Sequence, residues 1–204
     1  MFEQVKLSYA NDGLEPYVDT ATVETHYGKH HATYTKNFND AVEKAGLAGK
    51  TVEDILGNLD GVADEGLRKA LKNNGGGYYN HNLYFSTLSP EPGAPSAKFL
   101  QAVEEAFGSL EALTEKLSGL AKGQFGSGWA FLSVTPEGRL VASASANQDN
   151  PISEGTGNVP ILALDIWEHA YYLKYRNRRP DYIDAFFKVL DWAAVSALYE
   201  KAVA

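Results

Sequence analysis

Residues 129–144 read WAFLSVTPEGRLVASA, and this stretch decides the class of the fold. Two mostly apolar runs, 129–134 and 139–144, flank the sequence Thr-Pro-Glu-Gly. Proline at the second position and glycine at the fourth are typical of a type I turn. The stretch therefore predicts a β-hairpin.

The segments on either side of the hairpin extend the predicted domain to residues 96–204. Val159–Trp167 is a short apolar run and predicts a third strand. Apolar residues recur at helical spacing in 96–107, in 109–120 and from Asp181 onward. This order predicts an α+β fold whose C-terminal α/β domain has a three-stranded antiparallel sheet flanked by helices.

A predicted linker separates this domain from the first half of the chain. Residues 89–95, SPEPGAP, contain three prolines and a glycine, which neither a helix nor a central strand accommodates. Residues 1–88 are expected to form a helical domain whose two helices, at 18–44 and about 65–88, pair as an antiparallel hairpin. Because each glycine inside a helix costs about 1 kcal/mol, Gly75–Gly77 predicts either a break or a close approach to the backbone.

Composition excludes several classes of function. The 204 residues include no cysteine, which excludes a disulfide scaffold, a cysteine-ligated metal and a thiol nucleophile. The formal net charge of −8 argues against nucleic acid and anionic membranes as partners. No run approaches the ~18 apolar residues of a membrane span. The first residues, MFEQVK, do not resemble a signal peptide, so we expect a cytoplasmic protein.

The histidines indicate a metal site with nitrogen and oxygen ligands, a set that suits Fe, Mn, Cu, Ni or Zn. His26 and His30 share the apolar stripe of the first helix, and His81 lies on that of the second. Each could instead be a core histidine, although three of them would each need a buried polar partner. Asp165 and His169, four residues apart, could form a salt bridge or bind a metal. Spacing alone therefore predicts a His/Asp metal site between the two halves and leaves these alternatives open.

Other catalytic motifs are weak. Ser127 lies in Gly-Ser-Gly and lacks the G-x-S-x-G pattern of a hydrolase nucleophile. The glycines at 75–77 follow no predicted strand and match neither a dinucleotide-binding nor a phosphate-binding loop.

Five motifs in order resemble those of the iron/manganese superoxide dismutases. They are HYGKHHATY (26–34), NNGGGYYNH (73–81), GSGW (126–129), ANQDNP (146–151) and DIWEHAY (165–171). The resemblance implies that His26, His81, Asp165 and His169 bind one Mn or Fe ion per subunit, together with a solvent molecule in trigonal-bipyramidal geometry. The implied activity converts superoxide to O2 and H2O2 by alternating reduction and oxidation of that ion.

The resemblance also implies roles for the surrounding side chains. Gln148 would hydrogen-bond the solvent molecule and tune the reduction potential, since such contacts set the chemistry of a metal. Tyr34 would continue this relay and, with His30, form the gateway to the site. Trp129 and Trp167 would be apolar walls that exclude bulk water.

Four more residues are candidates for the entrance to the metal site and for the contact between subunits. Because the protein is acidic and superoxide is an anion, attraction must be local, and Lys29 and Arg179 are the candidates. Glu168 and Tyr172 resemble residues that, together with His30, cross a two-fold interface. The resemblance therefore implies a homodimer or homotetramer.

The choice of metal rests on one pair of positions. Gln148 in the segment after the hairpin, opposite Gly77, resembles the manganese type, whereas the iron type usually has glutamine at the position of Gly77. Tyr78, Phe85 and Phe131 depart from the residues frequent in the manganese type, which implies that either metal could serve. The residues alone leave two alternatives, another non-haem metal oxidoreductase and a helical module with a purely structural metal.

Overall fold

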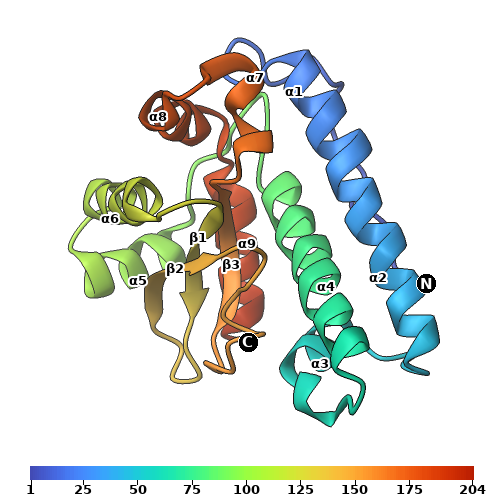
Figure 1. The fold of residues 1–204 in the computed structure, drawn as a ribbon. Helices are drawn as coiled ribbons and strands as arrows, with labels where there is room; N and C mark the ends of the chain where they lie inside the picture. Colours follow the sequence, from blue (N-terminus) through green and yellow to red (C-terminus); the bar gives the residue numbers. More distant parts are fainter.

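In the computed structural model, which describes residues 1–204, the N-terminal part is a helical hairpin (Figure 1). Its first arm is a continuous helical rod composed of α1 (Thr20–Thr25), a π-helical turn (His26–His31) and α2 (Ala32–Lys44). Its second arm is α4 (Glu65–Ser86), which packs along α2. The predicted helical hairpin is confirmed. The sequence reading missed the short elements between the arms, α3 (Val52–Gly57) and a 3-10 turn (Leu59–Gly61).

Local chemistry explains where the two arms begin. The side chain of Asp19 accepts a hydrogen bond from the main-chain N–H of Thr22, and the side chain of Asp64 accepts one from that of Leu67 at 2.7 Å. Both aspartates therefore act as N-caps, which satisfy donors that the first helical turn leaves unpaired.

The run Gly75–Gly77 does not break α4, so the alternative prediction, a close approach to the backbone, is the correct one. A Cβ on Gly76 would lie 2.2 Å from the carbonyl oxygen of Gln148, and one on Gly77 would lie 2.4 Å from Cδ1 of Tyr34. No residue with a side chain fits at either position without displacing its neighbour. The glycines therefore weaken the helix in order to admit two parts of the candidate site.

The C-terminal part contains the predicted three-stranded antiparallel sheet, in the order β2–β1–β3. The strands are β1 (Gly128–Val134), β2 (Leu140–Ala146) and β3 (Val159–Asp165). The predicted turn joins β1 to β2, and the N–H of Gly138 donates to the carbonyl oxygen of Thr135 at 2.8 Å. Every residue of the central strand β1 is buried, which explains its nearly unbroken apolar sequence.

Helices flank the sheet, as predicted, but the C-terminal end differs from the prediction. The helices are α5 (Ala97–Phe107), α6 (Leu110–Gly123), α7 (Tyr172–Tyr175), α8 (Arg179–Val189) and α9 (Trp192–Ala202). The single helix expected from Asp181 onward is two helices. The chain leaves α8 at Leu190, which pairs with Leu88, and Asp191 then donates its N–H to the carbonyl oxygen of Thr87 at 2.8 Å. The side chain of Asp191 caps α9, so contacts with the end of α4 impose the break.

The two parts share the larger of two hydrophobic clusters, and the smaller cluster lies within the helical hairpin. Figure 1 shows α4 between α2 and β3, and side chains of α4 such as Leu83 and Tyr84 belong to the same buried cluster as the sheet. Residues 89–95 lie in no helix or strand. None of the helices combines the length and the hydropathy that crossing a membrane requires.

Candidate metal centre

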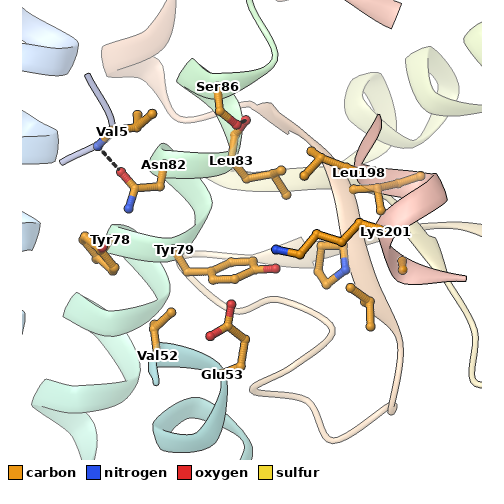
Figure 2. A pocket seen from close by; sticks show the side chains of 14 residues that line it. Val5, Val52, Glu53, Tyr78, Tyr79, Asn82, Leu83, Ser86, Leu198 and Lys201 are labelled. Carbon is orange, nitrogen blue, oxygen red and sulfur yellow. Dashed lines mark hydrogen bonds between the residues drawn. The ribbon is translucent and has the colours of Figure 1, made fainter. Parts of the chain in front are cut away.

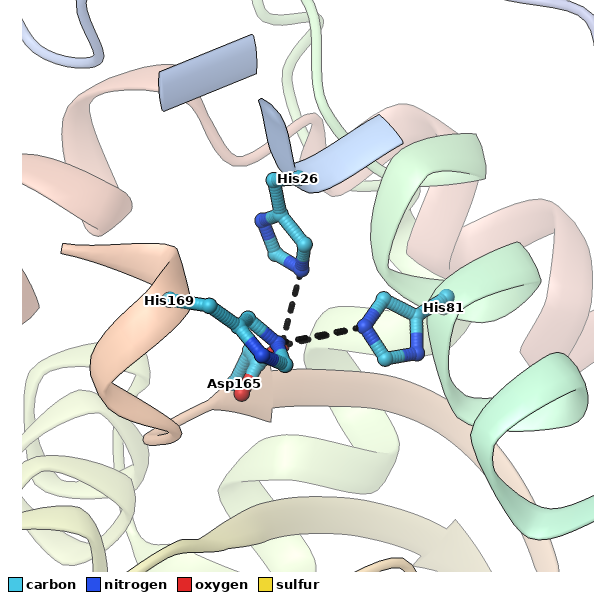
Figure 3. A group of neighbouring side chains, drawn as sticks. All are labelled: His26, His81, Asp165 and His169. Carbon is cyan, nitrogen blue, oxygen red and sulfur yellow. Dashed lines mark hydrogen bonds and ion pairs between the residues drawn. The ribbon is translucent and has the colours of Figure 1, made fainter. Parts of the chain in front are cut away.

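Three histidines and one aspartate converge where the hairpin meets the sheet (Figure 3). His26 comes from the π-helical turn, His81 from α4, Asp165 from the last position of β3, and His169 from a 3-10 turn (Glu168–Ala170). One ligand atom of each lies within 4.8 Å of the others. His26, His81 and Asp165 are buried and His169 is nearly so. The structure thus brings together all four residues that the sequence suggested.

The distances within this group are those of ligand atoms around a common centre. Oδ2 of Asp165 lies 3.0 Å from Nε2 of His26, 3.1 Å from Nε2 of His169 and 3.6 Å from Nε2 of His81. The Nε2 atoms of His81 and His169 are 3.3 Å apart. Nε2 of His26 is fully buried, yet it makes no well-directed hydrogen bond despite its distance to Asp165.

The tautomer of His81 shows why a metal fits. Nδ1 of His81 lies 2.6 Å from the carbonyl oxygen of Gly77, which can only accept a hydrogen bond. Nδ1 therefore carries the proton, and the lone pair of Nε2 faces the carboxylate of Asp165. A main-chain carbonyl that fixes the tautomer in this way is a usual feature of metal-binding histidines. A cation would satisfy Nε2 of His81, the unpartnered Nε2 of His26 and the carboxylate together.

Burial controls the charges of the group. It lowers the pKa of His26 to about 4 and moves the pKa of His81 well below its ordinary value. Burial alone would raise the pKa of Asp165, but His169 and His26 outweigh it, and the pKa lies below its usual range. At neutral pH His26 and His81 are therefore neutral imidazoles and Asp165 is a carboxylate, which are the protonation states that bind metal ions.

A chain of hydrogen bonds lies beside the centre. Oε1 of the buried Gln148 accepts from Nε1 of Trp129 at 3.0 Å, and Nε2 of Gln148 donates to the hydroxyl oxygen of Tyr34 at 3.0 Å. The rings of Tyr34 and Trp129 lie 5.1 and 5.0 Å from the ring of His81. Tyr34 and Trp129 thus place aromatic rings against His81, and Gln148 links the two through hydrogen bonds.

Comparison with known families matches both parts of the chain. Residues 1–89 match the model described as "Iron/manganese superoxide dismutases, alpha-hairpin domain", and residues 95–198 match "Iron/manganese superoxide dismutases, C-terminal domain". The chain belongs to the iron/manganese superoxide dismutase family. It is 49% identical to "Superoxide dismutase [Mn/Fe]" of Methylomonas sp. (strain J) and 48% identical to "Superoxide dismutase [Mn]" of Pseudomonas aeruginosa. Each alignment spans 199 residues and 97% of both chains.

As a member of this family the chain is an oxidoreductase that uses Mn or Fe, and the buried His/Asp group fits such an ion. Two further aromatic rings lie against it. The ring of His30 stacks on that of His169 at 4.3 Å, and the ring of Trp167 stacks on it at 5.5 Å. Nε1 of Trp167 donates to the carbonyl oxygen of Asn147 at 2.7 Å, which ties this side chain to the segment that carries Gln148.

The structure gives Arg179 contacts that the sequence did not indicate. Its guanidinium donates to the carbonyl oxygens of Gln124 and Gly126 at 2.7 and 2.9 Å, and only 16% of the side chain is exposed. Arg179 therefore anchors the segment that precedes β1 in this family member. Lys29, by contrast, lies exposed on the π-helical turn.

Several side chains in and near the 3-10 turn that contains His169 are exposed. Tyr172 and Leu173 are 50% and 45% exposed, and the side chain of Glu168 is 49% exposed. Glu168 accepts a hydrogen bond from the hydroxyl of Ser127 at 2.7 Å. Phe125, two residues before this serine, is 98% exposed. Apolar and charged side chains thus share the surface next to the centre.

Sequence reasoning missed the buried polar residues that support the centre. Asn80 and Asn150 are fully buried, and the amide of Asn80 donates to the carbonyl oxygen of Gln148 at 3.1 Å. His31 is fully buried, with Nε2 2.9 Å from Oδ1 of Asn82 and its ring stacked on that of His81 at 5.5 Å. The only available signal for Asn80 was its position next to His81 in the sequence.

A cavity of about 590 Å³ lies elsewhere, between α3, α4, β3 and α9 (Figure 2). Tyr79, Leu83, Leu198 and Lys201 are among its lining residues. None of the four residues that could hold the metal lines it. The metal centre and this cavity are therefore separate features.

Proposed function

We propose that the chain converts superoxide to O2 and H2O2 with a single Mn or Fe ion held by His26, His81, Asp165 and His169. The observation that carries the proposal is the convergence of these buried ligand atoms within 4.8 Å, next to an ordered amide. When bound, the ion supplies alternating one-electron reduction and oxidation. An iron oxygenase would need open positions and a pocket for an organic substrate. The cavity of about 590 Å³ is lined by none of the four proposed ligand residues.

Gln148 and Tyr34 are proposed to handle the protons that peroxide formation consumes. Because the hydroxyl oxygen of Tyr34 accepts from Nε2 of Gln148, its own proton is free to be donated elsewhere. Burial raises the pKa of Tyr34, although the hydrogen bond from Gln148 lowers it in part. The hydroxyl therefore stays protonated at neutral pH, ready to donate.

The aromatic residues are proposed to control access. Trp129 is fully buried against His81, where its ring excludes water and its N–H orients Gln148. His30 and Trp167 cover His169 with stacked rings and leave it only 8% exposed. A narrow approach past His30 and Tyr34 would admit a diatomic anion and exclude larger molecules. Arg179, which anchors the segment before β1, is proposed to lie at the edge of this approach.

We propose Mn as the principal metal, with Fe also able to support activity. The side chain beside the centre comes from Gln148, after β2, while Gly77 leaves room for the ring of Tyr34. This arrangement resembles the manganese type. The two similar proteins are named for Mn/Fe and for Mn, which agrees with this assignment.

The assembly is proposed to be a homodimer or homotetramer in the cytoplasm. Exposed apolar side chains rimmed by polar residues mark contact surfaces. Tyr172 and Leu173 are exposed shortly after His169, and Phe125 is exposed two residues before Ser127, which donates a hydrogen bond to Glu168. A two-fold contact there would place His30 near the interface of both subunits. We also propose that residues 1–88 and 96–204 act as two domains joined by the linker 89–95.

The decisive experiment is to measure superoxide dismutation by metal-free protein refilled separately with Mn and with Fe. We expect activity with Mn and lower or comparable activity with Fe. Gln148→Ala should keep the fold and the metal content while turnover falls at least about tenfold. Folded, metal-loaded protein that is inactive with both metals would overturn the proposed function and favour a structural metal.

A further inference from the structure

Asn150 is a fully buried amide in the loop after β2 whose orientation is fixed by the main chain. Its Oδ1 accepts hydrogen bonds from the N–H groups of Ile152 at 3.2 Å and Ser153 at 2.9 Å. A main-chain N–H can only donate, so the oxygen must face these two groups. Nδ2 of Asn150 therefore faces the other way, and it donates to Oδ1 of Asn80 at 2.9 Å.

The orientation passes from Asn150 to Gln148 through Asn80. Because Oδ1 of Asn80 receives the hydrogen bond from Asn150, its Nδ2 faces Gln148, 3.1 Å from the carbonyl oxygen and 3.4 Å from Oε1. From the other side Nε1 of Trp129, which can only donate, points at the same Oε1. Both ends of the network thus demand that Gln148 presents its oxygen to Asn80 and Trp129. Its Nε2 is left for the hydroxyl of Tyr34.

We propose that Asn150 is a positioning residue for Gln148, acting through Asn80 to hold the Gln148 amide in the orientation that donates to Tyr34. The inference rests on the proposed role of Gln148 beside the metal. The loop itself needs only the oxygen of Asn150, which binds two main-chain N–H groups. Nδ2 of Asn150 donates only to Asn80, so it is this hydrogen bond that positions Gln148. In a buried network each misdirected amide leaves a neighbour unpaired, which makes the orientation cooperative.

Asn150→Asp separates the two ends of this side chain. It keeps the shape and the acceptor for Ile152 and Ser153 but, when ionised, places an oxygen against Oδ1 of Asn80. Asn150→Ser keeps a short acceptor for the loop, cannot reach Asn80 and cannot ionise, so it serves as the second variant. The matched control is Ser153→Ala, which removes two hydrogen bonds of 3.1 Å to the main chain of Asn150 in the same loop and leaves Asn80 untouched.

The test combines turnover of the metal-loaded protein with crystal structures of the same variants. We expect Asn150→Asp and Asn150→Ser to keep full metal content and lose about tenfold in turnover, because small displacements of a positioned group have effects of this size. The distance from Nε2 of Gln148 to the Tyr34 hydroxyl should exceed hydrogen-bonding range in both. Ser153→Ala should change neither quantity.

A double-substitution series separates positioning from a merely structural role. In the Gln148→Ala background the Asn150 variants should cause no further loss of turnover, whereas an independent structural defect would add to it. Additive losses, or variants that keep both turnover and the Gln148–Tyr34 hydrogen bond, would overturn the inference. If Gln148→Ala alone leaves turnover unchanged, the proposed role of Gln148 is wrong. The crystal structures then still decide whether Asn150 orients the amide.

Discussion

Gly76→Ala adds one methyl group at the contact between α4 and the segment that carries Gln148. The added Cβ would lie 2.2 Å from the carbonyl oxygen of Gln148. Since real Cβ contacts do not fall below 3.0 Å, that oxygen must retreat by about 0.8 Å. The contact is with main chain, which cannot rotate away as a side chain would. The displacement therefore moves Gln148 itself and weakens its hydrogen bond from Asn80.

Three contributions determine how Gly76→Ala changes the free energy of unfolding. Alanine should gain about 1 kcal/mol over glycine inside a helix. Overpacking costs about 1–3 kcal/mol, and the weakened hydrogen bond costs about 1 kcal/mol. Gly119→Ala is the matched control, because Gly119 lies exposed in α6 with nothing within 4 Å of its would-be Cβ. The two variants should therefore differ in the free energy of unfolding by about 2–4 kcal/mol, with Gly119→Ala the more stable.

Turnover should separate the two variants more clearly than stability does. A misplacement of about 1 Å at a reacting centre can cost up to about a hundredfold in rate. We expect Gly76→Ala to lose at least about tenfold in superoxide dismutation at unchanged metal content, and Gly119→Ala to match the parent. The assays are denaturant unfolding, elemental analysis and steady-state kinetics. A Gly76→Ala protein that is as stable and as active as Gly119→Ala would refute the close contact with Gln148.

Three further predictions concern charge, orientation and pH. Asp165→Asn removes the only anion among the four proposed ligands, so metal content measured by elemental analysis should fall well below one ion per chain. Full occupancy would contradict the proposed ligand assignment. Trp129→Phe keeps an aromatic ring but removes the N–H that orients Gln148. Turnover should therefore fall severalfold, while the melting temperature changes by only a few degrees. Unchanged turnover would count against the role of the indole N–H in orienting Gln148. Burial lowers the pKa of His31 to about 4 from an ordinary 6.5, although Asn82 opposes this, so the unfolded chain binds more protons between these values. The contribution of His31 to the free energy of unfolding should accordingly fall by up to roughly 3 kcal/mol as the pH drops from 6.5 towards 4. His31→Gln should make the loss of stability in urea unfolding smaller by that amount, and an unchanged slope would contradict the lowered pKa.

The sheet could be predicted from sequence because its determinants are local. Residues 129–144 contain two apolar runs and the turn between them, and the structure places the hairpin there. The break between α8 and α9 could not be predicted in this way. Leu190 continues the apolar spacing of the helix before it, and what ends that helix is pairing with Leu88 and Thr87, about a hundred residues earlier. Tertiary contacts of this kind override helical spacing.

Helical spacing selected the region of the histidines at 26–31, but it did not account for the π-helical turn that contains them. Helical spacing of four placed His26 and His30 on one face, but the π-helical turn changes the register. As a result His26 and His31, five residues apart, are both buried, while His30 is only half-buried and stacks on His169. Spacing alone could not tell which of the three faces the metal. The resemblance assigned His26, and the distances to Asp165 agree with that assignment.

The glycine run and the orientation of Gln148 depend on contacts between distant segments, which helical spacing could not predict. At 75–77 the helical pattern and the glycine cost conflict, and the conflict is resolved only by Tyr34 and Gln148, which come from other elements. The orientation of Gln148 is likewise determined by donors far away in sequence, the indole of Trp129 and the amide of Asn80. The glycines at 75–77 are unfavourable inside a helix, and no neighbouring residue offsets this cost. They therefore indicated a place where distant parts of this chain meet. That inference applies most directly to Gly76, because its missing side chain defines how closely the hairpin approaches the loop after β2.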